Sequence, residues 1–142
     1  MQNKVELKPN SHDLFIEKIQ NIINRCNERE NQVSNSEARA NIVALATKMQ
    51  KQKSEVKSLL ISFERFVLLA SGDNKDAYIA GKLLLACDNT TPYFFQFNEF
   101  RMQTDNDFED TLNVIKLHRM GLVPLTQLIV DGEAFYEALR ER

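Results

Sequence analysis

The sequence predicts a mainly α-helical protein, in the form of a helical bundle around one long heptad-patterned helix. Apolar residues return every three or four positions from Ile42 to Ala70, which is the spacing of one helix face. No glycine or proline interrupts the stretch between Ser36 and Gly72. With 43% hydrophobic and 27% charged residues, the 142-residue chain also has the composition of one ordinary globular domain.

The domain organisation follows from the same pattern. Residues 1–10 are interpreted as a flexible polar leader, and residues 11–142 as a single helical domain with a helical core over 11–87 and a C-terminal subregion over 93–142. The N-terminal residues lack the apolar run of a secretory signal, and the longest apolar runs of the chain are five residues long, too short for a membrane span. A cytoplasmic location without membrane association is therefore expected.

The first helix is expected to begin at a Ser11 cap and to end near Arg29. Its apolar residues, among them Phe15 and Ile19, return at helical spacing. Polar residues 31–35 then connect it to the long helix, and a connection this short predicts an antiparallel helical hairpin.

The long helix is expected to begin at Ser36, or at a capping box formed by Ser34 and Glu37, and to end at Gly72. Its length of about 52 Å exceeds the roughly 37 Å diameter of a compact domain of this size, so a bend near residues 50–54 is the alternative to one unbroken helix. One face carries a stripe that consists of Ile42, Ala46, Met49, Lys53, Val56, Leu60, Phe63, Val67 and Ala70.

A third helix is expected over residues 75–87, after a cap at Asp73 or Asn74. Apolar residues surround this helix almost completely, which predicts that it is the buried central helix. Ala77 and Gly81 are small and lie four residues apart, so we expect the long helix to approach closely there.

The C-terminal subregion begins after a loop at 88–92. Four of the nine phenylalanines fall within 93–102, and this aromatic density favours a strand that belongs to the core, whereas Thr91–Pro92 favours the start of a helix. The next helix is expected over 105–120, with Gly121 as its stop.

The end of the chain has two readings. Residues 125–130 resemble a second strand, which would form a small two-stranded β element with 93–102 and change the class to α+β. Asp131 would then cap a last helix over 133–142, while the alternative is a hairpin turn at Asp131–Gly132. Strong helix formers after Gly132 favour the helix.

The sequence carries no motif of a cofactor, nucleotide or metal enzyme. Its histidines, His12 and His118, have no ligand cluster around them, and its cysteines, Cys26 and Cys87, are interpreted as buried free thiols. We therefore assign no catalytic, cofactor-binding or metal-binding residue.

One acidic cluster, formed by Asp105, Asp107, Glu109 and Asp110, lies where a helix is expected to begin. Negative charge stabilises the first turn of a helix, so we interpret the cluster as a solvated helix start, capped by Asp105 or Asp107, rather than as a divalent-metal site.

Four lysines, Lys48, Lys51, Lys53 and Lys57, are opposed only by Glu55 and give the middle of the long helix a local charge of +3. Such a face could follow a phosphate backbone, although lysine is equally typical of a solvated helix. Lys53 interrupts the apolar stripe, so its amine should reach water or pair with an acid from another helix.

The stripe also predicts an interaction surface at Val56, Leu60, Phe63 and Val67. Together with two flanking residues, Leu59 and Phe66, these side chains would form an exposed patch larger than a soluble monomer tolerates, which predicts a homodimer or a bound protein partner. The alternative is that the third helix and the C-terminal part of the same chain cover all of these side chains. The N-terminal half carries a net charge of +3 and the C-terminal half −5, a difference that would permit head-to-tail association.

Three functions are compatible with these features. The favoured one is a non-catalytic protein–protein interaction module, such as an adaptor, regulator or inhibitor, that acts through helical surfaces and can self-associate. The first alternative is a nucleic-acid-binding regulator that uses the Lys48–Lys57 face. The second alternative is a small cofactor-free enzyme whose carboxylates come together only on folding.

Overall fold

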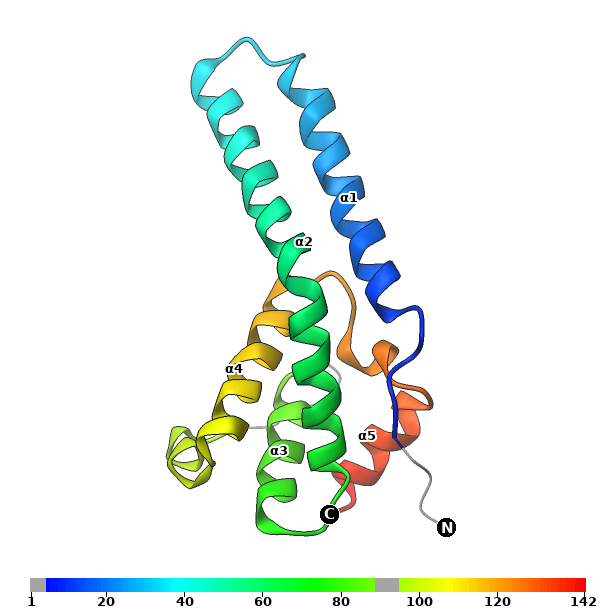
Figure 1. The fold of residues 1–142 in the computed structure, drawn as a ribbon. Helices are drawn as coiled ribbons and strands as arrows, with labels where there is room; N and C mark the ends of the chain where they lie inside the picture. The colour runs from blue at the N-terminus through cyan, green and yellow to red at the C-terminus, as the bar shows by residue number, and fades with distance from the viewer. Residues whose placement is uncertain (1–4, 89–94) are drawn as a thin grey trace. The chain divides into compact units, whose positions relative to one another are not determined.

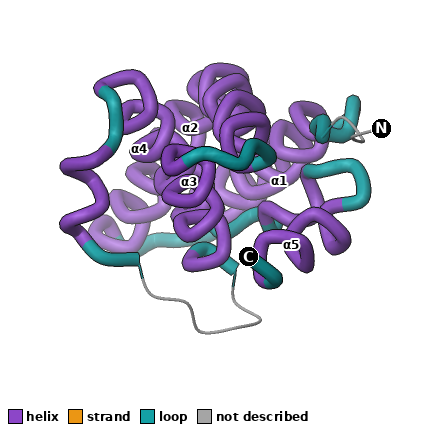
Figure 2. Tube along the Cα trace, turned by 90° about the horizontal axis from the view of Figure 1, so that it is seen from below, coloured by secondary structure: helices purple, strands orange, loops and turns teal. Residues whose placement is uncertain are grey.

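The computed structural model describes residues 5–88 and 95–142. The mainly α-helical class is confirmed, and Figure 2 shows helices and loops but no strand in the described parts of the chain. The element order is α1 (Ser11–Glu30), α2 (Ser36–Ala70), α3 (Lys75–Ala86), the 3-10 helix η1 (Phe97–Met102), α4 (Asp105–Met120), the 3-10 helix η2 (Leu125–Leu128) and α5 (Gly132–Arg140) (Figure 1). None of these helices is long and apolar enough to cross a membrane.

The chain divides into two compact units. The hairpin unit consists of residues 10–58, and the bundle unit consists of the described residues in 5–9 and 59–142. α2 contributes residues to both units, and each unit is described by itself below.

The hairpin unit contains α1 and the first part of α2, which lie side by side and antiparallel, as predicted (Figure 1). Buried side chains at helical spacing, including Phe15, Ile19 and Met49, form its core. Lys53 is half-buried, and its Nζ donates a hydrogen bond to Oε1 of Gln20 on α1 at 2.8 Å. Of the two alternatives predicted for Lys53, the acidic partner is wrong within the described residues, because the ammonium donates to a neutral amide from the other helix.

The helix starts use asparagine and threonine more than serine or aspartate. The N-cap position of α1 is Asn10 rather than Ser11, but the Asn10 side chain makes no capping hydrogen bond. At the start of α2, Oδ1 of Asn35 accepts a hydrogen bond from the backbone N–H of Ala38 at 3.0 Å. The cap of α3 is Asn74, one of the two residues predicted for that role. An Asx side chain satisfies the same free N–H groups as serine, so a serine one residue further on is a weak guide to the boundary.

The bundle unit is built on the second part of α2. Arg65 holds α4 through a bidentate ion pair, in which its Nε and Nη2 donate to the Asp110 carboxylate at 3.1 and 2.7 Å. Asn113 of α4 also donates to Oγ of the buried Ser62 at 2.8 Å. α4 is therefore fixed to α2 by polar contacts as well as by apolar packing.

α3 is buried on most sides, as its composition predicts. Leu84 is fully buried, and Ile79, Leu83 and Leu85 are exposed by 4% or less, although Tyr78 is 49% exposed. The predicted close approach to α2 at Gly81 is wrong, because a Cβ built at Gly81 would lie 3.2 Å from Leu139 of α5. The small residue therefore admits α5.

Both predicted strands are wrong where the structure describes them. Residues 97–102 form η1, residues 125–128 form η2, and 93–94 lie outside the described residues. The described β pairing is one antiparallel bridge between Leu7 and Ile129, flanked by a hydrogen bond from Lys8 N–H to the Leu128 carbonyl at 2.8 Å. Apolar and aromatic density marks burial or packing, which short helices and strands share.

The last helix is confirmed, and the hairpin turn at Asp131–Gly132 is not formed. Asp131 occupies the N-cap position in the left-handed conformation (φ 54°), without a side-chain capping bond. The stop of α4 is also as predicted, since Gly121 is left-handed (φ 64°), whereas Gly72, expected to end α2 in that way, does not have a positive φ.

Candidate functional site

The four predicted lysines do not form one uniform face. Lys48, Lys51 and Lys57 are exposed on α2, and within the described residues none of these three forms an ion pair. Lys53 instead turns to Gln20 of α1. Three free ammonium groups therefore remain on the surface of the hairpin unit.

The four apolar residues predicted to bind a partner are buried in the folded chain. Val56 and Phe63 have no exposed surface, Val67 is 1% exposed and Leu60 is 7% exposed. The flanking Leu59 and Phe66 are buried as well, so the exposed patch inferred from the stripe is wrong. The chain covers these residues itself, and that argument for a homodimer no longer applies.

Among the described residues, the most exposed large apolar side chain belongs instead to η1. Phe97 is 83% exposed and Met102 is 48% exposed, while Phe95, Phe100 and Phe108 are half-buried beside them. We call these five residues the aromatic patch. The prediction that the whole aromatic run lies in the core is wrong at Phe97.

The rings of the aromatic patch pack against one another. Phe100 is at the centre, with ring centroids 5.0 Å from Phe95, 5.7 Å from Phe97 and 5.5 Å from Phe108. These tilted and edge-to-face geometries are the preferred ones for aromatic pairs. Phe97 therefore has a neighbouring ring that restrains it although it faces solvent.

Polar contacts hold η1 in place at both ends. Lys82 of α3 forms an ion pair with Glu99 at 2.5 Å, and Gln103 donates to Oγ1 of the buried Thr111 at 2.8 Å. The hydrogen bond to Glu99 raises the pKa of the Lys82 ammonium, so this ammonium stays charged at neutral pH. Side chains from α3 and α4 thus fix the backbone that presents the patch.

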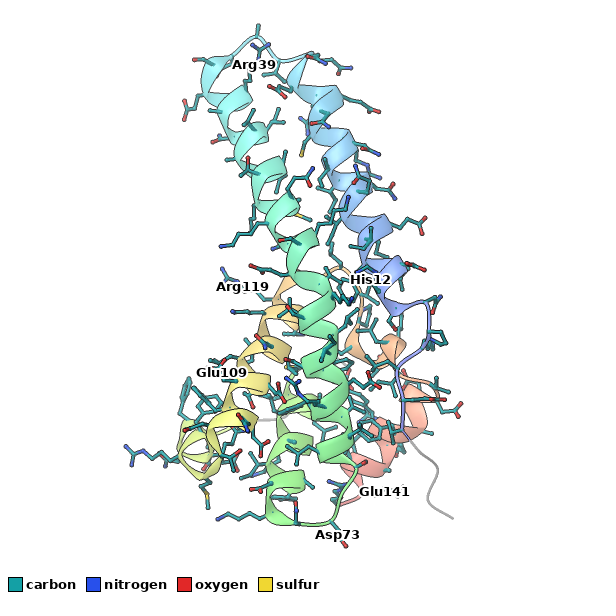
Figure 3. The ribbon with its side chains drawn as sticks, in the orientation of Figure 1. His12, Arg39, Asp73, Glu109, Arg119 and Glu141 are labelled. Carbon is teal, nitrogen blue, oxygen red and sulfur yellow. The ribbon has the colours of Figure 1, made fainter. Side chains whose placement is uncertain are left out.

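The acidic cluster lies at the start of α4, as predicted. The cap is Thr104, whose Oγ1 accepts a hydrogen bond from Asp107 N–H at 3.1 Å, so the expected capping by Asp105 or Asp107 is wrong. Asp110 pairs with Arg65, and Glu109 projects from α4 with an exposed side chain (Figure 3). Within residues 5–88 and 95–142, no group of three potential metal ligands comes together.

A second feature of the bundle unit is a cleft of about 330 Å³. It lies where the ends of α3 and α4 meet η2 and α5, and we call it the Tyr136 cleft. Its lining comprises Cys87, Asp88, His118, Gly121, Val123, Pro124, Leu125, Thr126, Gln127, Glu133 and Tyr136. Sequence reasoning missed this cleft because its residues come from four separate segments.

The Cys87 thiol and the Tyr136 phenol of the Tyr136 cleft are poorly suited to nucleophilic attack. Burial raises the pKa of the Cys87 thiol from 9.0 to about 11, so the thiol stays protonated at neutral pH. Burial, assisted by the negative charges of nearby groups such as Asp88, raises the pKa of Tyr136 further still. His118 lines the cleft, while His12 is exposed at the start of α1 (Figure 3).

The raised pKa of Cys87 predicts slow alkylation. In a Cys26→Ala background, the rate of reaction with iodoacetamide should keep rising between pH 9.0 and about 11, because only the thiolate reacts and burial delays its formation. The urea-unfolded protein provides the control, since its thiol should ionise near the ordinary value of 9.0. A folded-state rate that has already levelled off at pH 9.0 would contradict the burial of this thiol.

No model of a known protein family, no curated protein and no solved structure matches this chain. Functional inference therefore rests on the surfaces described above.

Proposed function

We propose that this protein is a non-catalytic protein–protein interaction module that binds its partner through the aromatic patch. The observation that carries the proposal is the 83% exposure of Phe97 beside the 48% exposure of Met102. Phenylalanine, methionine and arginine are enriched at protein interfaces, and Arg101 is exposed between these two residues in sequence.

The packing of the patch supports this function because it lowers the entropic cost of binding. The 5.7 Å contact between Phe97 and Phe100, and the ion pair that holds Glu99, restrict the positions that the exposed ring can take. A ring that is already ordered loses less freedom when a partner covers it. Buried aromatic anchors of this kind provide much of the energy of protein interfaces.

The chemistry of the patch also describes the partner. A complementary surface needs an apolar pocket for Phe97 and Met102, and an acidic group beside it would pair with Arg101. The partner is a second protein chain with such a pocket, and a second copy of this chain is the special case in which the module self-associates. An adaptor, regulator or inhibitor would use the surface in the same way.

Phe97→Asp should abolish partner binding while leaving the fold intact, because the side chain is 83% exposed. Tagged wild-type protein is recovered from an extract of the native cell, and bound proteins are identified by mass spectrometry. Leu68→Asp is the matched control, since Leu68 is 42% exposed on α2 of the same unit. We expect the partner to be recovered with the wild type and with Leu68→Asp, but not with Phe97→Asp.

Two further readouts separate the alternatives. Sedimentation of the purified wild type above the 16.4 kDa monomer mass, reversed by Phe97→Asp, would identify the partner as a second copy. Nucleic-acid binding by the free lysines of α2 would have two signs. The recovered partners would be lost after nuclease treatment, and they would also be lost in the double variant Lys48→Glu/Lys51→Glu. Equal recovery by Phe97→Asp and the wild type would contradict the proposal.

A further inference from the structure

The Tyr136 cleft contains a buried hydroxyl group that has no hydrogen-bond partner among the described residues. Tyr136 is 1% exposed, and its Oη has no partner in the described parts of the chain. A buried phenol usually finds a partner, because leaving its O–H unpaired costs free energy that phenylalanine at the same position would avoid. The hydroxyl therefore indicates a missing acceptor.

Tyr136 is itself one of the residues that line the cleft, together with Cys87, Asp88 and Glu133. Burial raises the pKa of the phenol, and the negative charges of Asp88 and Glu133 add to this effect. The cleft opens to solvent, because Pro124 and other lining residues are exposed.

The lining restricts the chemical class of a ligand. The phenol donates, so the ligand must present an acceptor such as a carbonyl oxygen. Asp88 is paired with Arg140 at 2.6 Å, and Glu133 is an exposed carboxylate. The negative charges of both residues act on the phenol. The cleft therefore disfavours an anionic ligand next to the Tyr136 hydroxyl. Buried Val123 and Leu125 add apolar walls that suit a ring or short chain.

We propose that the Tyr136 cleft binds a small uncharged molecule whose amide or ketone oxygen accepts a hydrogen bond from the Tyr136 hydroxyl. The volume of about 330 Å³ is in the range of small-molecule sites. The cleft and the aromatic patch share no residue, so this site does not depend on the proposed partner binding.

The test uses benzamide and benzoate as probes on the full chain. They have the same ring, but benzamide offers a neutral acceptor and benzoate an anionic one. Proton–nitrogen correlation spectra should show saturable benzamide shifts at amides that line the cleft, such as those of Cys87, Thr126 and Tyr136, and no saturable shift with benzoate. No saturable benzamide shift, or equal binding of benzoate, would overturn the proposal.

Tyr136→Phe tests the hydroxyl directly. The variant keeps the ring and should raise the dissociation constant of benzamide by about tenfold, the effect of one lost hydrogen bond. Without probe, the variant should melt at the same temperature as the wild type or higher, because it removes an unsatisfied group. A lower melting temperature would mean that water already satisfies the hydroxyl, and unchanged benzamide affinity would mean that the hydroxyl does not bind it; either result contradicts the proposal.

Discussion

Replacing Gly132 with alanine is expected to lower the free energy of unfolding by about 3 kcal/mol or more, at the upper end of the range for inserted atoms. A Cβ at this position would lie 1.9 Å from the Thr126 carbonyl oxygen and 3.0 Å from its carbonyl carbon. Both are backbone atoms of η2, which cannot rotate away as the end of a flexible side chain would. The substitution therefore forces η2 and α5 apart.

Two other glycines provide matched controls. Gly72→Ala should change stability by less than about 1 kcal/mol, because its Cβ would meet neighbours no closer than 3.4 Å. Gly121→Ala should cost about 1 kcal/mol, since its left-handed φ of 64° is unfavourable for alanine although nothing blocks the Cβ. Urea denaturation of the three variants measures their free energies of unfolding, and Gly132→Ala should have the lowest of the three. A Gly132→Ala protein as stable as Gly72→Ala would contradict the packing of η2 on α5.

Leu84→Ala is expected to lower the free energy of unfolding by about 2 to 5 kcal/mol, because it opens a cavity in a packed core. Leu84 is fully buried in α3, and its neighbour Leu85 is 4% exposed. Leu68→Ala is the control for the same chemical change at a 42% exposed position, and it should cost less than about 1 kcal/mol. If the two variants unfold at the same urea concentration, α3 is not the central helix of the bundle unit.

Helix positions could be predicted from the sequence where local chemistry decides them. The apolar residues of α3, the asparagine cap at Asn74 and the left-handed Gly121 each depend on a few neighbouring residues. The hairpin of α1 with the first part of α2 followed from a short polar connection. In each case the backbone requirement and the residue type are close together in the chain.

The errors arose where a residue's environment depends on distant segments. The aromatic run at 95–102 has the composition of a strand, yet Gln103 and Glu99 make contacts with Thr111 and Lys82 that hold η1 as a helical turn. Leu7 pairs with Ile129 across most of the chain length, and no local pattern predicts that bridge.

The functional surfaces were the least predictable part. The stripe residue Phe63 looked free because the sequence does not reveal that the chain covers it, whereas Phe97 looked like core because apolar character alone does not define exposure. A signal for Phe97 was present, since polar Gln96 and Asn98 flank it, but this alternation is equally typical of a strand. The Tyr136 cleft left no such signal.

Photo-crosslinking from the aromatic patch tests the proposed function most directly. A photoreactive benzoylphenylalanine is placed at position 97, or at position 68 as the control, in the full chain expressed in its native cell. We expect irradiation to join one dominant protein species to position 97 and little to position 68, because Phe97 is the anchor of the interface. Adducts at position 68 with none at position 97, or no protein adduct at either position, would contradict a role for the aromatic patch in partner binding.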